Sequence, residues 1–315
     1  MLRKIKSAND ISTFMANSLT VLETDSDHDS IFSDETLDAA ATPIFRNRIL
    51  SYTRLRELPV VTSTLKSELC LFSSTAALEN GDLPLLSVQL NKFHFIKKNA
   101  PFLTTFIHDY GMKQEYCRVF FKILQNNLTC YVFMYSSGKN LILLNNALKP
   151  HSDGVYKNTK LRAHGVSGAA STFGSSAIKL YLLDDSSSSL VDGMDEKSLS
   201  GMTTIKDLSI SESHKSSELY RAVISQKRNE VLRILALSKF IAPVPFATFF
   251  DHGGDKIDGI KVLGTIRLFE STTESDASIP DDTLTLSTLM LTLVEQELLK
   301  MRGHKKPSLV NVNSS

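Results

Sequence analysis

The chain has 315 residues, of which 42% are hydrophobic and 22% are charged. This is enough apolar material for one large domain or two small ones, and it excludes a chain that is disordered throughout. Thirty-five Lys and Arg residues stand against 34 Asp and Glu residues, a formal net charge of +1. No global field therefore draws the protein toward nucleic acid or a membrane, and any such contact must come from a local patch.

Residues 1–42 are predicted to form a disordered tail that is basic at its start and then acidic and serine-rich. The basic start is compatible with a mitochondrial presequence, a membrane-surface helix or a plain tail. Its basic residues are Arg3, Lys4 and Lys6. Three serines among the carboxylates would suit an acid-directed kinase, although a solvated linker without a regulatory role is the alternative. These candidate phosphorylation sites are Ser26, Ser30 and Ser33.

From residue 43 the sequence changes to short runs of β-branched, aromatic and leucine residues, separated by turn sequences. We predict strands at 65–72, 85–96, 102–108, 116–124, 128–135, 140–145, 246–250 and 260–269. The close spacing of these runs predicts an antiparallel meander that closes into a barrel or a sandwich. The three cysteines in this region lie among apolar neighbours, which predicts buried free thiols in a reducing compartment. They are Cys70, Cys117 and Cys130.

A glycine-rich stretch lies between two further predicted strands in the segment 160–184. Its sequence Gly165-Val166-Ser167-Gly168-Ala169 is close to the nucleophile-elbow pattern, which makes Ser167 a candidate hydrolase nucleophile. However, the last position of the pattern is Ala, and a strand rather than a helix is predicted to follow it. A hairpin turn whose glycines permit positive φ explains the same residues.

Residues 185–217 are again serine-rich and acidic, and we predict a disordered insertion there. Order resumes at 219–225, and 230–240 has a pattern that fits a strand or a helix. An acidic turn follows, with Asp251, His252, Asp255 and Asp258. The spacing of these four residues fits neither a calcium loop nor a zinc motif, so we predict no metal site and no cofactor.

The stretch 281–300 predicts a helix with unusual surroundings. Asp281 or Asp282 is placed to cap its N-terminus, and Gly303 is placed to end it. Its apolar residues surround most of the helix axis, with only Thr and Ser between them, so the helix belongs inside the domain. A membrane crossing would need about 20 apolar residues, whereas this run meets Glu295 and Glu297 well before that length.

These segments give a mainly β, α+β fold: an antiparallel barrel or sandwich around a buried C-terminal helix, as one domain from residue 43 to 303, with a disordered tail at 304–315. This order of elements resembles the tubby C-terminal-like fold, which includes the LURP-one-related proteins. The resemblance rests on architecture and on the helical stretch 283–299, with no family motif matched residue for residue. It implies a closed barrel around the helix and, in tubby proteins, phosphoinositide binding through basic surface residues.

Two functional hypotheses follow for a protein that we expect to be cytoplasmic. The first is a non-enzymatic adaptor that binds other proteins and carries phosphorylatable disordered segments. The second is a peripheral membrane protein that binds phosphoinositide headgroups, with no role for nucleic acid. Its candidate headgroup patch consists of Lys92, Lys97, Lys98, Lys160 and Arg162. A serine hydrolase that uses Ser167 is a further alternative.

Overall fold

The computed structural model describes residues 45–46, 51–52, 54–62, 68–91, 100–109, 111–125, 127–149, 151–165, 177–194, 217–252, 256–257, 260–270 and 279–304. Contacts divide the chain into two units, Met1–Ile44 and Phe45–Ser315, and every described residue belongs to the second. The predicted N-terminal tail, the segment 195–216 and residues 305–315 lie outside the described residues. Their predicted disorder therefore remains a prediction.

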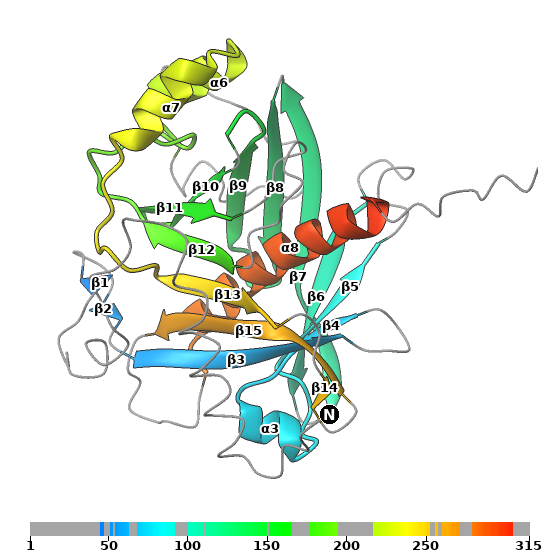
Figure 1. The fold of residues 1–315 in the computed structure, drawn as a ribbon. Helices are drawn as coiled ribbons and strands as arrows, with labels where there is room; N and C mark the ends of the chain where they lie inside the picture. Colours follow the sequence, from blue (N-terminus) through cyan, green and yellow to red (C-terminus); the bar gives the residue numbers. More distant parts are fainter. Residues whose placement is uncertain are drawn as a thin grey trace, which may run out of the picture. The chain divides into compact units, whose positions relative to one another are not determined.

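One large antiparallel sheet dominates the second unit (Figure 1). Its first strands are β3 (Arg54–Thr62), β4 (Leu69–Leu71), β5 (Leu86–Leu90), β6 (Leu103–Asp109), β7 (Met112–Gln125) and β8 (Leu128–Tyr135). They are followed by β9 (Asn140–Asn146), β10 (His151–Tyr156), β11 (Thr159–His164), β12 (Ala177–Leu182), β13 (Ala247–Asp251), β14 (Lys256–Ile257) and β15 (Ile260–Glu270). A separate two-residue pairing joins β1 (Phe45–Arg46) to β2 (Ser51–Tyr52). The short helix α3 (Thr75–Glu79) lies between β4 and β5.

The large sheet closes on itself. Neighbouring strands follow the chain order from β3 to β13, and β15 then pairs with both β13 and β3. β14 stands outside this ring as a short hairpin with β15, so that twelve of the thirteen strands of the large sheet form a closed antiparallel barrel. Closure leaves the ring without an exposed strand edge. The prediction of a mainly β fold, with an antiparallel barrel around a C-terminal helix, is confirmed.

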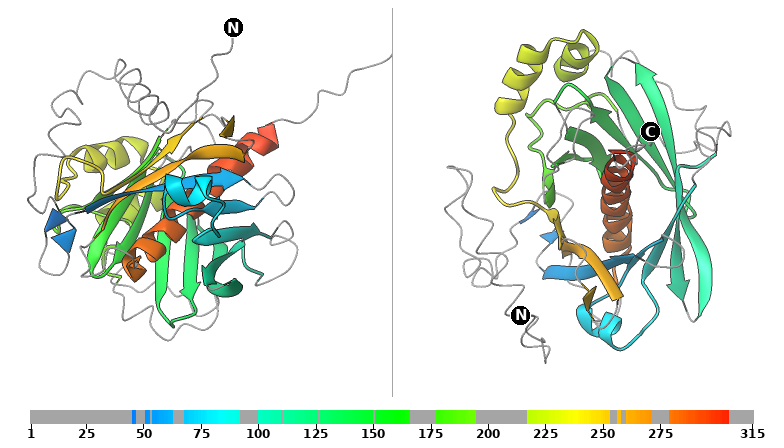
Figure 2. Two further views of the ribbon diagram at one scale, coloured as in Figure 1. Left: turned by 90° about the horizontal axis from the view of Figure 1, so that it is seen from below. Right: turned by 45° about the vertical axis from the view of Figure 1, so that its right-hand side comes forward.

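Helix α8 (Asp281–His304) runs through the ring of strands (Figure 2). All its side chains from Thr283 to Val294 are at most 8% exposed, and Glu295 is 1% exposed. The helix is therefore buried on all sides, as its sequence predicts. The predicted end at Gly303 is one residue early, because the helix includes His304. Among the described residues, no helix combines the length and the apolarity that a membrane crossing requires.

The first turn of α8 is attached to the barrel by polar contacts. Asp281 accepts a hydrogen bond from the Tyr116 hydroxyl (2.9 Å) and pairs with Lys139 (2.9 Å). Asp282 accepts a hydrogen bond from the Tyr156 hydroxyl and pairs with Lys157 (2.6 Å). The two carboxylates, predicted as helix caps, thus bind side chains of β7, β10 and the neighbouring turns, which fixes the depth of the helix in the barrel.

Polar contacts continue one turn further into the barrel. The Tyr135 hydroxyl donates to the backbone carbonyl of Thr285 (3.2 Å). The Thr283 hydroxyl donates to Glu270 on β15, whose carboxylate also pairs with Arg56 on β3 at 2.8 Å. Glu270 is 2% exposed, so this contact joins the helix to the strands that close the barrel without leaving a buried charge unpaired.

The tight passage between β13 and β15 requires a glycine at position 264. A Cβ atom added there would lie 2.1 Å from the Phe250 carbonyl oxygen and 2.7 Å from ring carbons of Phe249. We expect Gly264→Ala to lower the free energy of unfolding by about 3 kcal/mol or more, since neither the backbone nor the buried ring has room to move. Urea unfolding measures the change.

Gly81→Ala is the matched control for this substitution. Gly81 has φ +72°, and no atom lies within 4 Å of an added Cβ. Gly81→Ala should therefore lower the free energy of unfolding only through backbone strain, by about 1 kcal/mol. If Gly264→Ala were as stable as the wild type, the described closure of the barrel at β13 and β15 would be wrong.

Candidate functional site

A second layer covers part of the outer wall of the barrel, and we call it the outer layer. It consists of residues 184–194 and 217–239, the latter containing the helices α6 (Glu218–Ile224) and α7 (Arg228–Ala236) (Figure 1). The segment 230–240, whose pattern fits a strand or a helix, is therefore largely helical. Buried apolar residues of the outer layer pack on outward-facing side chains of β8, β9 and β10. They include Leu190, Val191, Leu219, Tyr220, Val223, Val231 and Ile234.

The first part of the outer layer is the serine-rich stretch that the sequence predicts as the start of a disordered insertion. The structure corrects that prediction for residues 185–194 and Ser217. Ser187 is 5% exposed and Ser189 is fully buried. Their hydroxyl groups have specific partners, because Ser187 donates to the Lys239 carbonyl (3.0 Å) and Ser189 donates to Asp153 (2.9 Å). Because their hydrogen bonds are satisfied inside the protein, these buried hydroxyl groups are compatible with an ordered segment.

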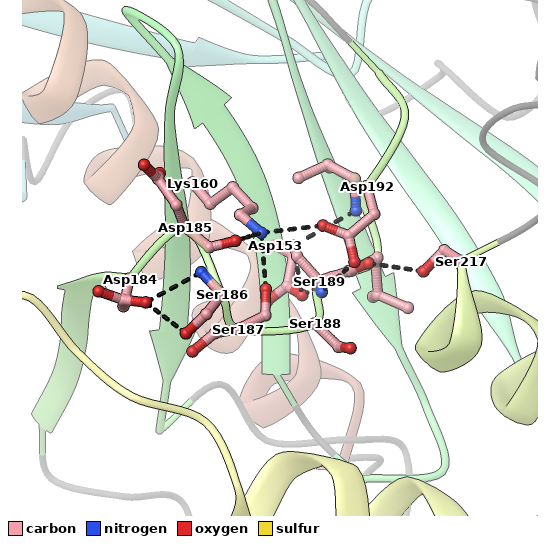
Figure 3. Close-up of polar contacts among 12 residues, drawn as sticks. Asp153, Lys160, Asp184, Asp185, Ser186, Ser187, Ser188, Ser189, Asp192 and Ser217 are labelled. Carbon is pink, nitrogen blue, oxygen red and sulfur yellow. Dashed lines mark hydrogen bonds and ion pairs between the residues drawn. The ribbon is translucent and has the colours of Figure 1, made fainter.

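The stretch 184–192 folds around the ammonium group of Lys160 (Figure 3). Lys160 donates to the carbonyl oxygens of Asp185 (2.9 Å) and Ser187 (2.6 Å) and pairs with Asp192 (3.1 Å). Ser217, the N-cap of α6, donates to the Ser189 carbonyl (2.9 Å). These contacts tie the serine-rich stretch to β11 on one side and to α6 on the other.

A buried ion pair holds the outer layer to the wall. Asp153 on β10 and Arg162 on β11 are both fully buried. The guanidinium donates to both carboxylate oxygens, at 2.7 and 2.8 Å, and this bidentate geometry is the strongest form of such a pair. Arg162 also donates to the Ser188 carbonyl (2.9 Å) and to the Ser238 hydroxyl (2.6 Å).

Asp153 accepts two further hydrogen bonds from the outer layer. They come from the Ser189 hydroxyl (2.9 Å) and the Leu190 amide (2.8 Å). Burial alone would raise the pKa of Asp153, but the Arg162 guanidinium and the Leu190 amide hold it well below its ordinary value. The carboxylate therefore stays charged, and the clamp formed by Asp153 and Arg162 joins β10, β11, residues 188–190 and the end of α7.

His151 lies beside this clamp and is 1% exposed. Its Nδ1 donates to the Lys149 carbonyl (2.8 Å), which leaves Nε2 as the unprotonated nitrogen, 3.8 Å from Asp153 Oδ2. Burial lowers the pKa of His151, so the ring stays neutral in the folded protein.

His164 lies two residues after Arg162 on β11, and it gives the stability of the protein a testable pH dependence. Burial, together with the positive charge of Arg162, lowers the pKa of His164 to about 4. The unfolded chain binds this proton near pH 6.5, so the folding contribution is complete above about pH 6.5 and is lost as the pH falls toward 4. We expect the free energy of unfolding to fall by on the order of 2 kcal/mol through His164 between pH 7 and pH 4.

Urea unfolding of the wild type and of His164→Gln across this pH range tests the expectation. Gln cannot take up the proton, so the variant should lose less stability on acidification than the wild type. Identical pH profiles would show that His164 is not the group responsible. Asp153 does not explain a loss in this window, because a carboxyl group with a lowered pKa loses its contribution only at still lower pH.

The predicted headgroup patch is not assembled by the described residues. Arg162 is fully buried in its pair with Asp153, and Lys160 binds the stretch 184–192. Neither side chain is available to a ligand at the surface, so both are corrected from surface residues to structural ones. The remaining patch residues, Lys92, Lys97 and Lys98, lie outside the described residues, as do Ser26, Ser30, Ser33 and Ser167.

A different basic surface lies on the outer face of α6 and α7, which the sequence analysis does not single out. Residues 217–239 contain five basic residues and two acidic ones, a net charge of +3. Two leucines are exposed among these charges, Leu232 at 38% and Leu237 at 66%. We call this surface the α6–α7 face and define it by Arg221, Lys227, Arg228, Leu232, Arg233 and Leu237. A prediction of a helix at 228–236, with Val231 and Ile234 on its buried side, would have placed these basic residues on the opposite, exposed side.

No group of three or more His, Cys, Asp or Glu side chains that could hold a metal ion occurs among the residues that the structure describes. His252, from the acidic turn, lies 3.0 Å from the Thr265 hydroxyl through Nε2. Asp255 and Asp258 of the same turn lie outside the described residues.

Comparison with known proteins adds one relationship. The chain has no significant match among the curated proteins or among the solved structures. A family model described as DIA1 matches residues 108–300. This match extends from the end of β6 through the outer layer and along most of α8, so it includes the clamp and the α6–α7 face. Since it spans more than half of the 315 residues, the chain belongs to the DIA1 family.

Proposed function

We propose that this DIA1-family protein is a non-enzymatic binding protein that uses its barrel as a rigid scaffold and its outer layer as the binding surface. The observation that carries the proposal is the filled interior: α8 occupies the barrel, and its side chains from Thr283 to Glu295 are buried. Because the helix occupies the interior of the described barrel, the proposal places recognition on the outside.

The outer layer is suited to this role for two reasons. It is anchored to the barrel by the Asp153–Arg162 clamp and by a continuous apolar contact. It also presents exposed arginines and leucines together, and arginine is enriched at the energetic centres of protein interfaces. The anchoring keeps the surface preformed, which lowers the entropic cost of binding.

The resemblance to the tubby-like fold that the sequence suggests is compatible with the scaffold part of the proposal, because that fold is also a closed barrel around a helix. It does not supply a ligand. The alternative proposal, phosphoinositide binding through the predicted headgroup patch, has lost Lys160 and Arg162 to structural contacts. We therefore place the binding surface on the outer layer.

Quantitative affinity purification tests the proposal. Leu232→Ser and Leu237→Ser, combined in one full-length variant, should remove specific binding partners while leaving the melting temperature close to that of the wild type, because both side chains are exposed. Ile123→Ser is the matched control, since Ile123 is 73% exposed on β7, outside the outer layer. A partner identified in this way is then purified and its binding is measured directly.

Two outcomes would overturn the proposal. If the double leucine variant and the Ile123→Ser control retained the same partners with the same affinity, the outer layer would not be the binding surface. If a fluorophosphonate probe labelled the purified protein at Ser167, the protein would be an enzyme, and the non-enzymatic proposal would be abandoned.

A further inference from the structure

We infer that the α6–α7 face binds an acidic amphipathic segment of a partner protein, with Arg221 and Arg228 taking its carboxylates and Leu232 and Leu237 taking its apolar side chains. This inference rests on the proposed function, because it names the kind of partner that the outer layer accepts.

The distribution of ion pairs on the α6–α7 face supports this assignment. Arg233 pairs with Glu218 at 2.7 Å, and Lys227 pairs with Glu230 at 3.3 Å. Within the described part of the chain, Arg221 and Arg228 make no ion pair, and both are exposed. A guanidinium group is built for bidentate contact with a carboxylate, so these two side chains are the ones that a partner's acidic residues would engage.

All four side chains are exposed on the α6–α7 hairpin. Arg228 and Leu232 are four residues apart on α7 and therefore lie one above the other. Arg221 follows Glu218 by three residues on α6. It therefore lies nearer than the Arg233–Glu218 pair to the connection between the helices. The connection is tight, with Gln226 at φ 57° and the Lys227 amide bonded to the Ala222 carbonyl at 2.9 Å. Arg221 and Arg228, which make no ion pair among the described residues, thus lie toward the same end of the hairpin.

A protein segment fits this surface better than a bilayer does. Basic patches that hold proteins on anionic lipid contain about four to eight Lys or Arg residues without interspersed acids. The α6–α7 face instead carries Glu218 and Glu230 between its cations. Mixed charges with two separate apolar anchors select a partner of complementary pattern, and they weaken attraction to a uniformly negative plane.

The experiment uses the full-length protein and a fluorescein-labelled amphipathic peptide composed of Glu, Ala and Leu. A peptide in which every Glu is replaced by Gln is the neutral control. We expect the Glu peptide to bind, its affinity to fall with rising salt, and the Arg221→Glu, Arg228→Glu double variant to lose about tenfold or more in affinity. Fluorescence anisotropy measures the binding.

The matched control reverses two charges elsewhere, Lys113→Glu and Arg118→Glu on β7, and should bind the Glu peptide as the wild type does. Equal binding of the Glu and Gln peptides, or an unchanged affinity of the Arg221→Glu, Arg228→Glu variant, would overturn the inference. The inference would also be overturned if the wild type sedimented with vesicles that contain phosphatidylserine or phosphoinositides and the Arg221→Glu, Arg228→Glu variant did not. This result would assign the surface to a membrane. If the wild type failed to bind the Glu peptide but the Leu232→Ser, Leu237→Ser variant still lost its partners, this inference would be wrong and the proposed function would stand.

Discussion

Replacing Leu289 by Asp is expected to abolish folding of the barrel. Leu289 is fully buried at the middle of α8, and an ionised carboxylate there would have no partner charge and no water. The cost of burying such a charge exceeds the total stability of an ordinary domain, about 5 to 15 kcal/mol. The variant should therefore appear in the insoluble fraction, and any soluble part should show no cooperative thermal transition.

Smaller changes in the same helix should give graded effects. Leu286→Ala, Leu289→Ala and Leu293→Ala should each lower the free energy of unfolding by about 2 to 5 kcal/mol, through lost transfer energy and the cavity left behind. All three leucines are at most 1% exposed. Leu237→Asp is the control, because it introduces the same charge at a site that is 66% exposed and should cost little.

The helix is also expected to be required for the barrel as a whole. A chain that lacks residues 281–302 would expose the inward-facing side chains of every strand, and it should aggregate. If this chain, or Leu289→Asp, gave a cooperative transition at the wild-type temperature, α8 would be peripheral and the architecture described above would be wrong.

The central helix could be predicted from the sequence because the information is local. Its apolar residues recur around the whole helix axis within a single stretch, and such a pattern has one stable environment. The strands with aromatic and β-branched residues were predictable for the same reason, and β8 begins and ends at the predicted residues, Leu128 and Tyr135. Closure into a barrel follows less directly, since it depends on the pairing of β15 with both β3 and β13.

Two strands of the barrel, β10 and β3, escaped prediction because polar or charged residues, and in β3 a proline, interrupt their apolar pattern. β10 has the sequence His151-Ser152-Asp153-Gly154-Val155-Tyr156, which looks like a turn, yet all six residues are buried. β3 contains charged residues and Pro59, which argue against a central strand. Both are strands because neighbouring strands provide partners for them: β3 pairs with β15, which is distant in sequence, and β10 pairs with the adjacent strands β9 and β11. Asn145 accepts from Ser152, and Arg162 pairs with Asp153.

The outer layer explains why Lys160 and Arg162 were wrongly predicted to be surface residues of the headgroup patch. Alternation along β11 correctly puts Lys160 and Arg162 on the outer wall of the barrel, where basic residues are normally exposed. The stretch 184–190 then covers this part of the wall, and the polarity of that stretch made it appear disordered. Neither the burial of Arg162 nor the folding of the serines could be predicted alone, because each provides the hydrogen-bonding partners of the other.

Removing the guanidinium of Arg162 is the second change with a large expected effect. Arg162→Ala leaves the Asp153 carboxylate buried without its partner charge, and breaking a buried pair in this way costs about 3 to 5 kcal/mol. We expect the loss to appear first as release of the outer layer, because Arg162 also holds the Ser188 carbonyl and the Ser238 hydroxyl. Hydrogen exchange should accelerate in α6 and α7 well before it does in α8, and urea unfolding gives the total loss.

A double variant, Asp153→Leu with Arg162→Met, separates the lost charge balance from the lost hydrogen bonds. It removes both charges and fills the space with apolar atoms, so it should be more stable than Arg162→Ala. It should still be less stable than the wild type, because the Leu190 amide and the Ser188 carbonyl lose their partners inside the protein. If Arg162→Ala unfolded at the wild-type urea concentration, with unchanged exchange in α6 and α7, the clamp would have no role in holding the outer layer. A double variant no more stable than Arg162→Ala would instead assign the loss to the hydrogen bonds rather than to the unpaired charge.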